Sequence, residues 1–418
     1  MKYSIKELIT DKISGEWGDE SINGGGYKVL RTTNFTNLGK INFENVVERK
    51  IDEKKVNQKH LKNGDVIIEK SGGSPTQPVG RVVFFDLNTT EKFLCNNFTA
   101  ILRPNSDLVY SKYLFYQLHL LHTRGRTLKY QNKTTGIINL KLDNYLEEEI
   151  EVPPISDQLN IANVLTKAEN LISQRKESIR LLDEYLKSTF LEMFGDPSTN
   201  KRSFPSGTIR DVAKEVKYGT SSPAEEEGCY PYLRMNNITS SGYMDYSKLK
   251  YINVDITEKE KYSVKKGDLL FNRTNSKELV GKTGVFNLES EMIIAGYLIR
   301  VRTNEKANPW YLWGYLNSVH GKQTLFGMCK SIVGMANINA QELQSINILM
   351  PPIELQNQFA KIIEKTESLK SQYKQSLKEL ENLYGCLSQK AFKGELNFKD
   401  EILMMAAEPE IGYNQNNS

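Results

Sequence analysis

Short polar loops carry the residue types in this sequence that could do chemistry, and they occur at matching places in the two halves of the chain. Residues 70–74 (Lys-Ser-Gly-Gly-Ser) follow a Gly-Asp run in the first half, and residues 272–277 (Asn-Arg-Thr-Asn-Ser-Lys) follow one in the second. Residues 133–136 and 330–334 form a second matching pair of loops, and each precedes a short apolar run. The sequence thus offers two similar sets of cations, hydroxyls and glycine-bearing turns.

Arg31 and Arg234 also match, because each follows a β-like run and stands three residues before an Asn. Guanidinium, ammonium and hydroxyl groups and exposed backbone N–H groups bind phosphates, whereas Arg and Asn side chains match the edges of bases. We therefore predict that these loops contact nucleic acid. The candidate residues are Arg31, Asn34, Lys70, Ser71, Ser74, Lys133, Thr134, Arg234, Asn237, Arg273, Thr274, Lys277, Lys330 and Ser331.

The same loops have a simpler interpretation, in which they are ordinary hairpin turns. Arg31 and Arg234 could also form buried ion pairs with carboxylates that recur in both halves. The loop sequences differ between the halves while the framework around them persists. That difference is expected of two binding sites with different specificities on one scaffold, but the loops alone leave these alternatives open.

Signatures of catalysis are absent or incomplete. The segment 276–283 ends in Gly-Lys-Thr like a phosphate-binding loop, but Ser276 stands where the first glycine is required. No Gly-x-Gly-x-x-Gly motif follows a strand, and no Asn/Asp-Pro-Pro-aromatic motif of amino-methyltransferases is present. His119 and His122 share a helix face without an evident third ligand, so we expect no catalytic residue and no metal site.

The composition describes an ordinary globular chain with a weak positive charge. The 418 residues suggest two to three domains, and 39% are hydrophobic and 25% charged. A net charge of +4 permits a nucleic-acid partner but requires any basic surface to be local. The four cysteines are far apart, which fits a reducing cytosol. The first residues lack the apolar core of a signal peptide, and no apolar run is long enough to span a membrane, so we expect a cytoplasmic protein.

An internal repeat organises the whole chain. The segment 27–34 (Tyr-Lys-Val-Leu-Arg-Thr-Thr-Asn) recurs at 230–237, a shift of 203 residues, and Gly-Asp-hydrophobic at 64–68 recurs at 267–271. Pro-Pro-Ile-x-x-Gln at 153–158 recurs at 351–356, a shift of 198. Because the order is kept and the shift drifts little, the chain is a tandem duplication.

Each half begins with about 150 residues of short β-like runs separated by Gly, Asn and Ser clusters. The expected strands are 66–68, 81–85, 100–102, 269–271, 284–286 and 297–301, and the expected short helices are 113–121 and 310–319. A long segment that is almost free of Gly and Pro follows each Pro-Pro pair.

The long segments repeat apolar residues every seven positions, which predicts a coiled coil. A twofold relation between the repeats would make the two helices antiparallel; the simpler alternative is that each helix packs only on its own domain. Residues Arg175, Thr189, Thr366 and Lys370 do not fit the apolar columns. The residues expected to pack the helices or to bind partner subunits are Ile161, Leu165, Ile172, Ile179, Leu186, Phe359, Ile363, Tyr373, Leu380 and Leu387.

The predicted fold class is α+β, with two tandem mixed α/β domains separated by two long helices that pack as an antiparallel coiled coil. The predicted boundaries are residues 1–152 for the first domain, 153–193 for the first helix, 194–350 for the second domain, 351–392 for the second helix and 393–418 for a tail.

This ordered set of motifs resembles the specificity subunit of type I restriction–modification systems over nearly the whole chain. The resemblance rests on the doubled Tyr-x-x-Leu-Arg-x-x-Asn, Gly-Asp-hydrophobic and Pro-Pro-Ile-x-x-Gln elements. Residues 190–197 (Phe-Leu-Glu-Met-Phe-Gly-Asp-Pro) and 389–396 (Gln-Lys-Ala-Phe-Lys-Gly-Glu-Leu) after the helices are also characteristic.

The resemblance implies a non-catalytic subunit in which each recognition domain reads one half of a bipartite asymmetric DNA site. It implies double-stranded DNA, two modification (methyltransferase) subunits and restriction (translocase–nuclease) subunits as partners, and no membrane. S-adenosylmethionine, ATP and Mg are then expected on the partner subunits, and no cofactor on this chain. Base-contacting residues vary within the family, so none is transferred to a position here. The alternative function is a duplicated coiled-coil scaffold that binds protein or glycan.

Overall fold

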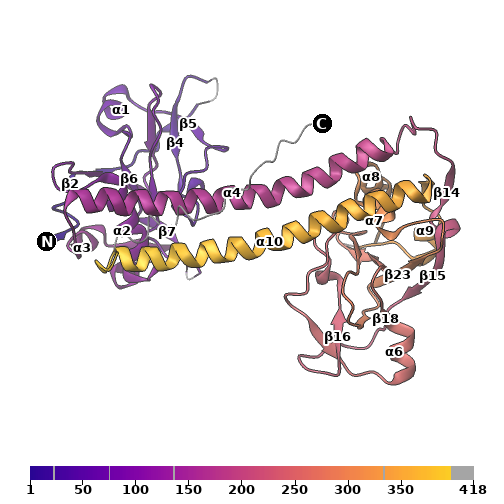
Figure 1. The fold of residues 1–418 in the computed structure, drawn as a ribbon. Helices are drawn as coiled ribbons and strands as arrows, with labels where there is room; N and C mark the ends of the chain where they lie inside the picture. The colour runs from indigo at the N-terminus through magenta and orange to yellow at the C-terminus, as the bar shows by residue number, and fades with distance from the viewer. Residues whose placement is uncertain (22–23, 75, 135–136, 333–334, 397–418) are drawn as a thin grey trace, which may run out of the picture. The chain divides into compact units, whose positions relative to one another are not determined.

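A computed structural model describes residues 1–21, 24–74, 76–134, 137–332 and 335–396, which form two units (Figure 1). Unit 1 contains residues 1–174 and the end of the chain from Leu377, and unit 2 contains Arg175–Ser376. Each of the two long helices therefore contributes one part to each unit.

The described residues of unit 1 form four small sheets. The central sheet has the order β2-β10-β6-β8, with β2 (Ile9–Ser14), β10 (Thr99–Pro104), β6 (Val66–Glu69) and β8 (Val82–Phe84). The second has the order β3-β5-β4-β9, with β3 (Asp19–Glu20), β5 (Val47–Lys50), β4 (Tyr27–Leu30) and β9 (Phe93–Cys95). The third has the order β11-β12-β7, with β11 (Gln131–Thr134), β12 (Ile137–Leu140) and β7 (Ser71–Gly73). Strands β1 (Lys2–Ser4) and β13 (Glu149–Glu151) form the fourth.

Unit 2 repeats this arrangement, except that the fourth strand of its second sheet lies at the opposite edge. Its central sheet is β15 (Ala213–Tyr218), β23 (Leu298–Thr303), β19 (Leu269–Asn272) and β21 (Thr283–Val285). The second is β17 (Lys250–Ile252), β16 (Tyr230–Leu233), β22 (Met292–Ile294) and β18 (Ser263–Val264). The third is β20 (Thr274–Asn275), β25 (Met335–Asn337) and β24 (Lys330–Ile332), and β14 (Ser206–Thr208) pairs with β26 (Asn347–Leu349). All six predicted strands overlap strands of the structure.

The short helices lie beside these sheets. Unit 1 has α1 (Glu53–Lys59), α2 (Ser111–Thr123) and α3 (Leu142–Leu146), with 3₁₀ turns at Thr32–Asn34 and Arg126–Tyr130. Unit 2 has α5 (Ile209–Val212), α6 (Ile256–Tyr262), α7 (Pro309–Asn317), α8 (Val319–Met328) and α9 (Ala340–Gln344), with a 3₁₀ turn at Met235–Asn237. The predicted helices at 113–121 and 310–319 correspond to α2 and α7.

The apolar run after each Gly-Asp pair is buried on both sides. In β6, Val66 and Ile68 point into the larger core of unit 1, whereas Ile67 points into a separate cluster with Val83 and Phe85. Successive side chains of a strand point to opposite faces, so a strand covered on both faces is apolar at every position. This explains why the run is continuous rather than alternating, and β19 repeats the pattern.

The long helices are α4 (Ile155–Phe194) and α10 (Ile353–Ala391), and they lie side by side within each unit (Figure 1). In unit 2, Phe190 contacts Phe359, and the guanidinium of Arg175 lies 4.4 Å from the ring centre of Tyr373. In unit 1, the Tyr384 hydroxyl donates to a Glu169 carboxylate oxygen at 3.1 Å. Residue numbers rise along one helix as they fall along the other, so the predicted antiparallel pairing is confirmed.

Most of the predicted packing residues are buried, and both packing alternatives operate together. Ile161 and Leu165 join Leu387 in the domain core of unit 1, and Phe359 and Ile363 join the core of unit 2. In each unit, one end of α4 and one end of α10 therefore pack on the domain core as well as on each other. The remaining predicted positions are Ile172, Leu186 and Leu380, which are buried, and Ile179 and Tyr373, which are half-buried.

Candidate nucleic-acid interface

Loops that are far apart in the sequence meet in the three-stranded sheet of each unit. Strand β7 contains Ser71, and β11 contains Lys133 and Thr134; both pair with β12. In unit 2, β20 contains Thr274, β24 contains Lys330 and Ser331, and both pair with β25. The structure thus brings the two predicted loops of each half into one sheet. The side chains of Lys133, Thr134, Lys330 and Ser331 lie outside the part that the structure describes.

A hydroxyl–amide hydrogen bond recurs across these sheets. The Ser71 hydroxyl donates to the side-chain oxygen of Asn139 at 2.5 Å, and the Thr274 hydroxyl donates to that of Asn337 at 2.9 Å. Sequence reasoning missed both asparagines as site residues. Their signal was the repeat itself, because Gly-x-x-Asn at 136–139 recurs at 334–337.

Lys70 and Arg273 take equivalent positions at the edge of this sheet. The backbone N–H of Lys70 donates to the carbonyl of Phe98 at 2.9 Å, and that of Arg273 donates to the carbonyl of Tyr297 at 3.0 Å. The Lys70 ammonium donates to the Ser14 hydroxyl, and burial lowers its pKa. Among the described residues neither cation has a carboxylate partner within ion-pair distance. No carboxylate of the described residues therefore pairs with their positive charge.

Arg273 lies over an aromatic ring, with its guanidinium carbon 4.7 Å from the ring centre of Tyr218. The Lys277 ammonium likewise lies 4.2 Å from the ring centre of Phe326. Ser74 accepts the backbone N–H of Gln77 at 3.1 Å, so its hydroxyl stabilises a turn. Arg273 and Lys277 remain candidates for DNA contacts, while the geometry of Ser74 is that of a hairpin residue.

Asn34 and Asn237 have a structural role, which corrects their assignment as DNA contacts. Their side-chain oxygens accept the backbone N–H groups of Arg31 and Arg234, both at 2.9 Å. Their amide groups donate to the carbonyls of Asn42 at 3.0 Å and Asp245 at 2.9 Å. Both side chains are almost fully buried, so these asparagines form the 3₁₀ turns and do not face a ligand.

Among the residues that the structure describes, the arginines of these turns have no carboxylate partner, so the buried ion pairs considered above are not seen there. The Arg31 guanidinium donates to the Asn45 carbonyl at 3.0 Å, and Arg234 is half-buried. The repeated carboxylates pair with other arginines: Arg103 binds Asp65 with two bonds of 2.9 Å, and Arg302 binds Asp268 at 2.9 and 3.2 Å.

A second cation fixes each 3₁₀ turn beside the polar sheet. Arg81 donates to the carbonyls of Thr32 and Phe35 at 3.2 and 3.3 Å, and it binds the carboxylate of Glu69, the residue before Lys70. In unit 2, Lys282 donates to the carbonyls of Met235 and Ile238 at 2.8 and 2.5 Å. Arg81 thus ties the turn that follows Arg31 to the strand end that carries Lys70. Lys282 bonds the carbonyls of the turn that follows Arg234.

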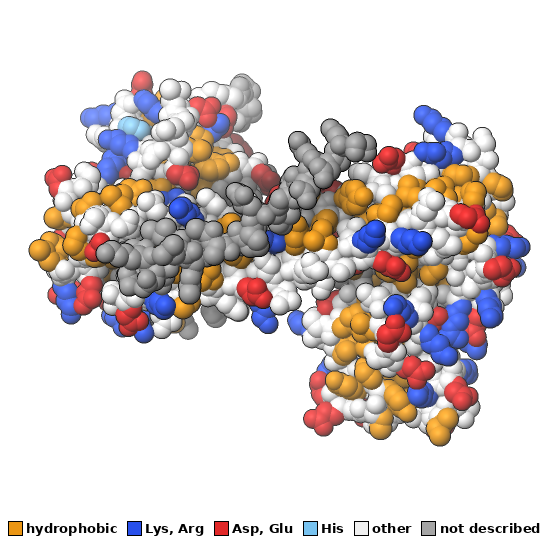
Figure 2. Space-filling model, in the orientation of Figure 1, with side chains coloured by type: hydrophobic (Ala, Val, Ile, Leu, Met, Phe, Trp, Pro, Cys, Tyr) orange, Lys and Arg blue, Asp and Glu red, His pale blue; other side chains and the backbone are white. Residues whose placement is uncertain are grey.

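The electrostatic surface agrees with a low net charge. On the face drawn in Figure 2, Lys and Arg side chains are interspersed with Asp and Glu in both units.

Within the described ranges, no cluster of three or more His, Cys, Asp or Glu residues could hold a metal ion. The helices of the same part of the chain include none that is long and apolar enough to cross a membrane.

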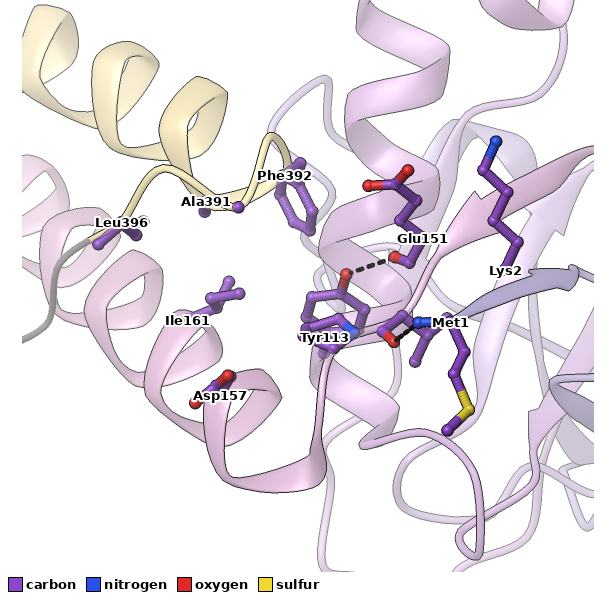
Figure 3. Close-up of a pocket in the computed structure, with 12 residues that line it drawn as sticks. Met1, Lys2, Tyr113, Glu151, Asp157, Ile161, Ala391, Phe392 and Leu396 are labelled. Atoms are coloured by element: carbon purple, nitrogen blue, oxygen red, sulfur yellow. Dashed lines mark hydrogen bonds between the residues drawn. The ribbon is translucent and has the colours of Figure 1, made fainter.

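A cavity of about 300 Å³ in unit 1 lies between the N-terminus and the end of α10 (Figure 3). The N-terminal amine donates to the carbonyl of Val152 at 3.0 Å, and the Tyr113 hydroxyl donates to that of Glu151 at 3.0 Å. Phe392 packs against Tyr113 with 5.5 Å between ring centres. None of the predicted DNA-contact residues lines this cavity, so it belongs to the helix–domain junction.

The chain contains two similar domains, and each has a cation without a described carboxylate partner beside a polar three-stranded sheet. The two long helices pack against both domains. This duplicated arrangement is that of a recognition protein with two binding sites. The family model described as the type I restriction modification DNA specificity domain matches residues 2–181 and 204–382. The chain therefore belongs to this family, and it is a non-catalytic specificity subunit that recognises DNA sequence.

Known proteins similar to this chain agree with the family. The EcoKI specificity subunit of Escherichia coli K12 is 24% identical over 88% of this chain and 82% of its own. The putative MjaX specificity subunit of Methanocaldococcus jannaschii is 29% identical over 91% of this chain and 90% of its own. The crystal structure of the S subunit from M. genitalium has a similar fold, with a TM-score of 0.58 at 16% identity over 94% of this chain and 96% of that one.

Proposed function

We propose that each unit reads one half of a bipartite, asymmetric DNA sequence through its three-stranded sheet and the loops beside it. The observation that supports this most strongly is the equivalent placement of different residues. Lys70 and Arg273 donate their backbone N–H groups to the equivalent carbonyls of Phe98 and Tyr297. Ser71 and Thr274 pair with the equivalent residues Asn139 and Asn337. Different side chains on one framework are expected to read different bases.

In this proposal the contacts divide by chemistry. Lysines neutralise phosphates, so the candidates Lys70, Lys133, Lys277 and Lys330 contribute affinity for any sequence. The affinity for DNA falls as salt rises, and the slope of its logarithm against the logarithm of salt concentration counts the phosphate contacts. Replacing Lys133 or Lys330 with Ala is expected to make this slope less steep by roughly 0.9 per lost contact. The sequence-reading candidates are Arg31, Ser71 and Thr134 in unit 1 and Arg234, Arg273, Thr274 and Ser331 in unit 2.

We further propose that the long helices bind two modification subunits, and that restriction subunits join the same complex in the cytoplasm. S-adenosylmethionine, ATP and Mg then belong to those partners, and this chain alone transfers no methyl group. The helices carry exposed apolar side chains at equivalent places of the repeat, Tyr185 on α4 and Leu383 on α10, which are 51% and 42% exposed. Such side chains are suited to a protein partner.

Methylation mapping tests the proposal. In a strain that carries this gene and its partner genes, residues 1–152 are replaced with the corresponding domain of another family member. We expect the methylated sequence to change in one half only, and methylation of the site to disappear when the gene is deleted. A change in both halves, or a site that persists after deletion, would contradict the proposal. The reciprocal replacement of residues 194–350 is the matched control, because it should change the other half.

A further inference from the structure

Each unit presents one exposed aromatic side chain at an equivalent turn. Phe98 lies between β9 and β10 and is 42% exposed, and Tyr297 lies between β22 and β23 and is 54% exposed. Large apolar side chains are usually buried, because exposing them to water is unfavourable. A single exposed one needs no explanation, but the same exposure at matching positions of a duplicated chain points to a shared use.

The backbone fixes both rings at the third position of a tight turn. The backbone N–H of Thr99 donates to the carbonyl of Asn96 at 3.0 Å, and that of Leu298 donates to the carbonyl of Ala295 at 2.8 Å. These bonds close four-residue turns with Phe98 and Tyr297 just before the last residue. The rings are therefore presented on a preorganised backbone, which reduces the entropy lost on binding.

The same turns form part of the candidate interface. The Phe98 carbonyl accepts the N–H groups of both Lys70 and Ser71, at 2.9 and 3.1 Å, and the Tyr297 carbonyl accepts that of Arg273. The Phe98 ring also covers Gly72 of β7, since a Cβ added there would lie 3.6 Å from the ring. Each ring thus stands beside a cation that pairs with no carboxylate of the described residues, and beside a strand that carries a hydroxyl.

A second apolar side chain on the same sheet repeats in the same way. Ile137 begins β12 and is 49% exposed, and Met335 begins β25 and is 58% exposed. Their neighbours on the strand alternate with them, because Ile138 and Ala336 are buried. The outer side of each sheet therefore combines an apolar group with polar and cationic ones. That mixture fits a DNA groove, where base edges offer methyl groups and hydrogen-bonding atoms beside phosphates.

We propose that Phe98 and Tyr297 are specificity-determining residues, each of which packs its ring against base edges in the groove of one half-site of double-stranded DNA. The proposal rests on the proposed function, because it assigns a further contact to the same sites. The ring surface supplies the contact in both units. The Tyr297 hydroxyl adds a group that can donate or accept a hydrogen bond at its rim.

Selection of binding sites from randomised duplex DNA tests the proposal, with the full chain in complex with its modification subunits. Phe98→Ala is expected to lower affinity for the preferred site by roughly ten- to a hundredfold, as for loss of one good base contact, and to relax one or two positions in one half-site only. Tyr297→Ala should do the same in the other half-site. Tyr297→Phe keeps the ring and should retain most of the affinity.

The matched control is Ile256→Ala in α6. Ile256 is 75% exposed, but Glu53 stands at its counterpart in the repeat, so its loss should leave the selected site unchanged. Thermal unfolding checks that each variant is folded, which we expect because the rings are exposed. Unchanged affinity and site preference in folded Phe98→Ala and Tyr297→Ala variants would overturn the proposal. Failure of the unaltered complex to select any sequence would instead overturn the proposed function.

Discussion

The two Gly-Asp turns show why single residues repeat in this chain. Gly64 and Gly267 have φ angles of 93° and 91°, a region that favours glycine. The carboxylate of Asp65 accepts the backbone N–H of Lys62 at 2.7 Å while it binds Arg103, and Asp268 repeats this arrangement. The motif is repeated because it closes a turn around a buried ion pair, and not because it contacts a ligand.

We expect Asp65→Ala to lower the free energy of unfolding by about 3 kcal/mol, because the variant leaves a largely buried guanidinium without its partner. The Asp65 side chain is only 2% exposed and that of Arg103 17%. Urea unfolding followed by circular dichroism measures the change. The control is Glu147→Ala, which removes a partner from the exposed Lys6–Glu147 pair and should have no measurable effect. Equal effects of the two substitutions would contradict this account of Asp65.

Arg234 and Asn237 are three residues apart and should respond differently to substitution. Arg234→Ala is expected to weaken binding to the preferred DNA by about 1–3 kcal/mol and to relax one base position, with little change in stability. Asn237→Ala should instead lower the free energy of unfolding by about 1–3 kcal/mol, because a buried N–H and a carbonyl lose their partner. DNA titrations and urea unfolding of both variants separate these effects. Normal DNA binding by a folded Arg234→Ala variant would remove that arginine from the interface.

At the scale of elements, the Pro-Pro-Ile-x-x-Gln motif fixes where each long helix begins. The Gln158 side chain accepts the backbone N–H of Tyr110 at 2.7 Å and donates to the carbonyl of Pro153 at 2.8 Å. Gln356 makes the matching bonds with Asn308 and Pro351, at 2.9 and 2.8 Å. Proline is favoured at helix starts, and the buried glutamine then attaches the first turn to the domain. Both glutamines are therefore structural.

The two cations that interrupt the apolar helix columns, Arg175 and Lys370, have partners across the helix pair. Lys370 is 5% exposed, forms an ion pair with Asp183 of α4 and lies 3.8 Å from the ring centre of Tyr243. The nearby Glu367 has a pKa raised by burial. A buried polar pair of this kind can specify one register of two helices, at a cost in stability.

We expect Lys370→Met to lower the free energy of unfolding by about 3 kcal/mol, because Asp183 and Glu367 then lack their cation. Adding Asp183→Leu should recover part of that loss, since an apolar pair can replace an ion pair in a helix interface. Chemical unfolding of the single and double variants gives the coupling energy. Lys361→Met, on an exposed position of α10, is the control and should have no measurable effect. A double variant less stable than the single one would contradict the pairing.

At the scale of the whole molecule, α4 and α10 are the segments that run from one unit into the other. We expect a seven-residue helical insertion into both helices, after Gln174 and after Ser376, to lengthen the spacer between half-sites by about three base pairs. Seven residues add about 10 Å, against 3.4 Å per base pair, and they keep the seven-residue pattern in phase.

Methylation mapping reads the spacer directly. The half-site sequences should stay unchanged, because the recognition loops are not altered. An insertion into α10 alone should abolish methylation, since it breaks the pairing with α4. An unchanged spacer in an active complex with both insertions would show that the helices do not set the distance.

The sequence by itself determined the duplication, six of the strands and the two long helices, and it predicted the antiparallel pairing that the structure confirmed. These features follow from local patterns, which are apolar runs bounded by turns and a seven-residue period. Only the tertiary structure decided that Asp65 pairs with Arg103, that Asn34 and Asn237 are buried in turns, and that residues 70–74 join β12. The exposure of Phe98 and Tyr297 also became visible only there. The physical reason is that these relations join residues far apart in the chain, and packing and strand register, rather than local sequence, decide which distant groups meet.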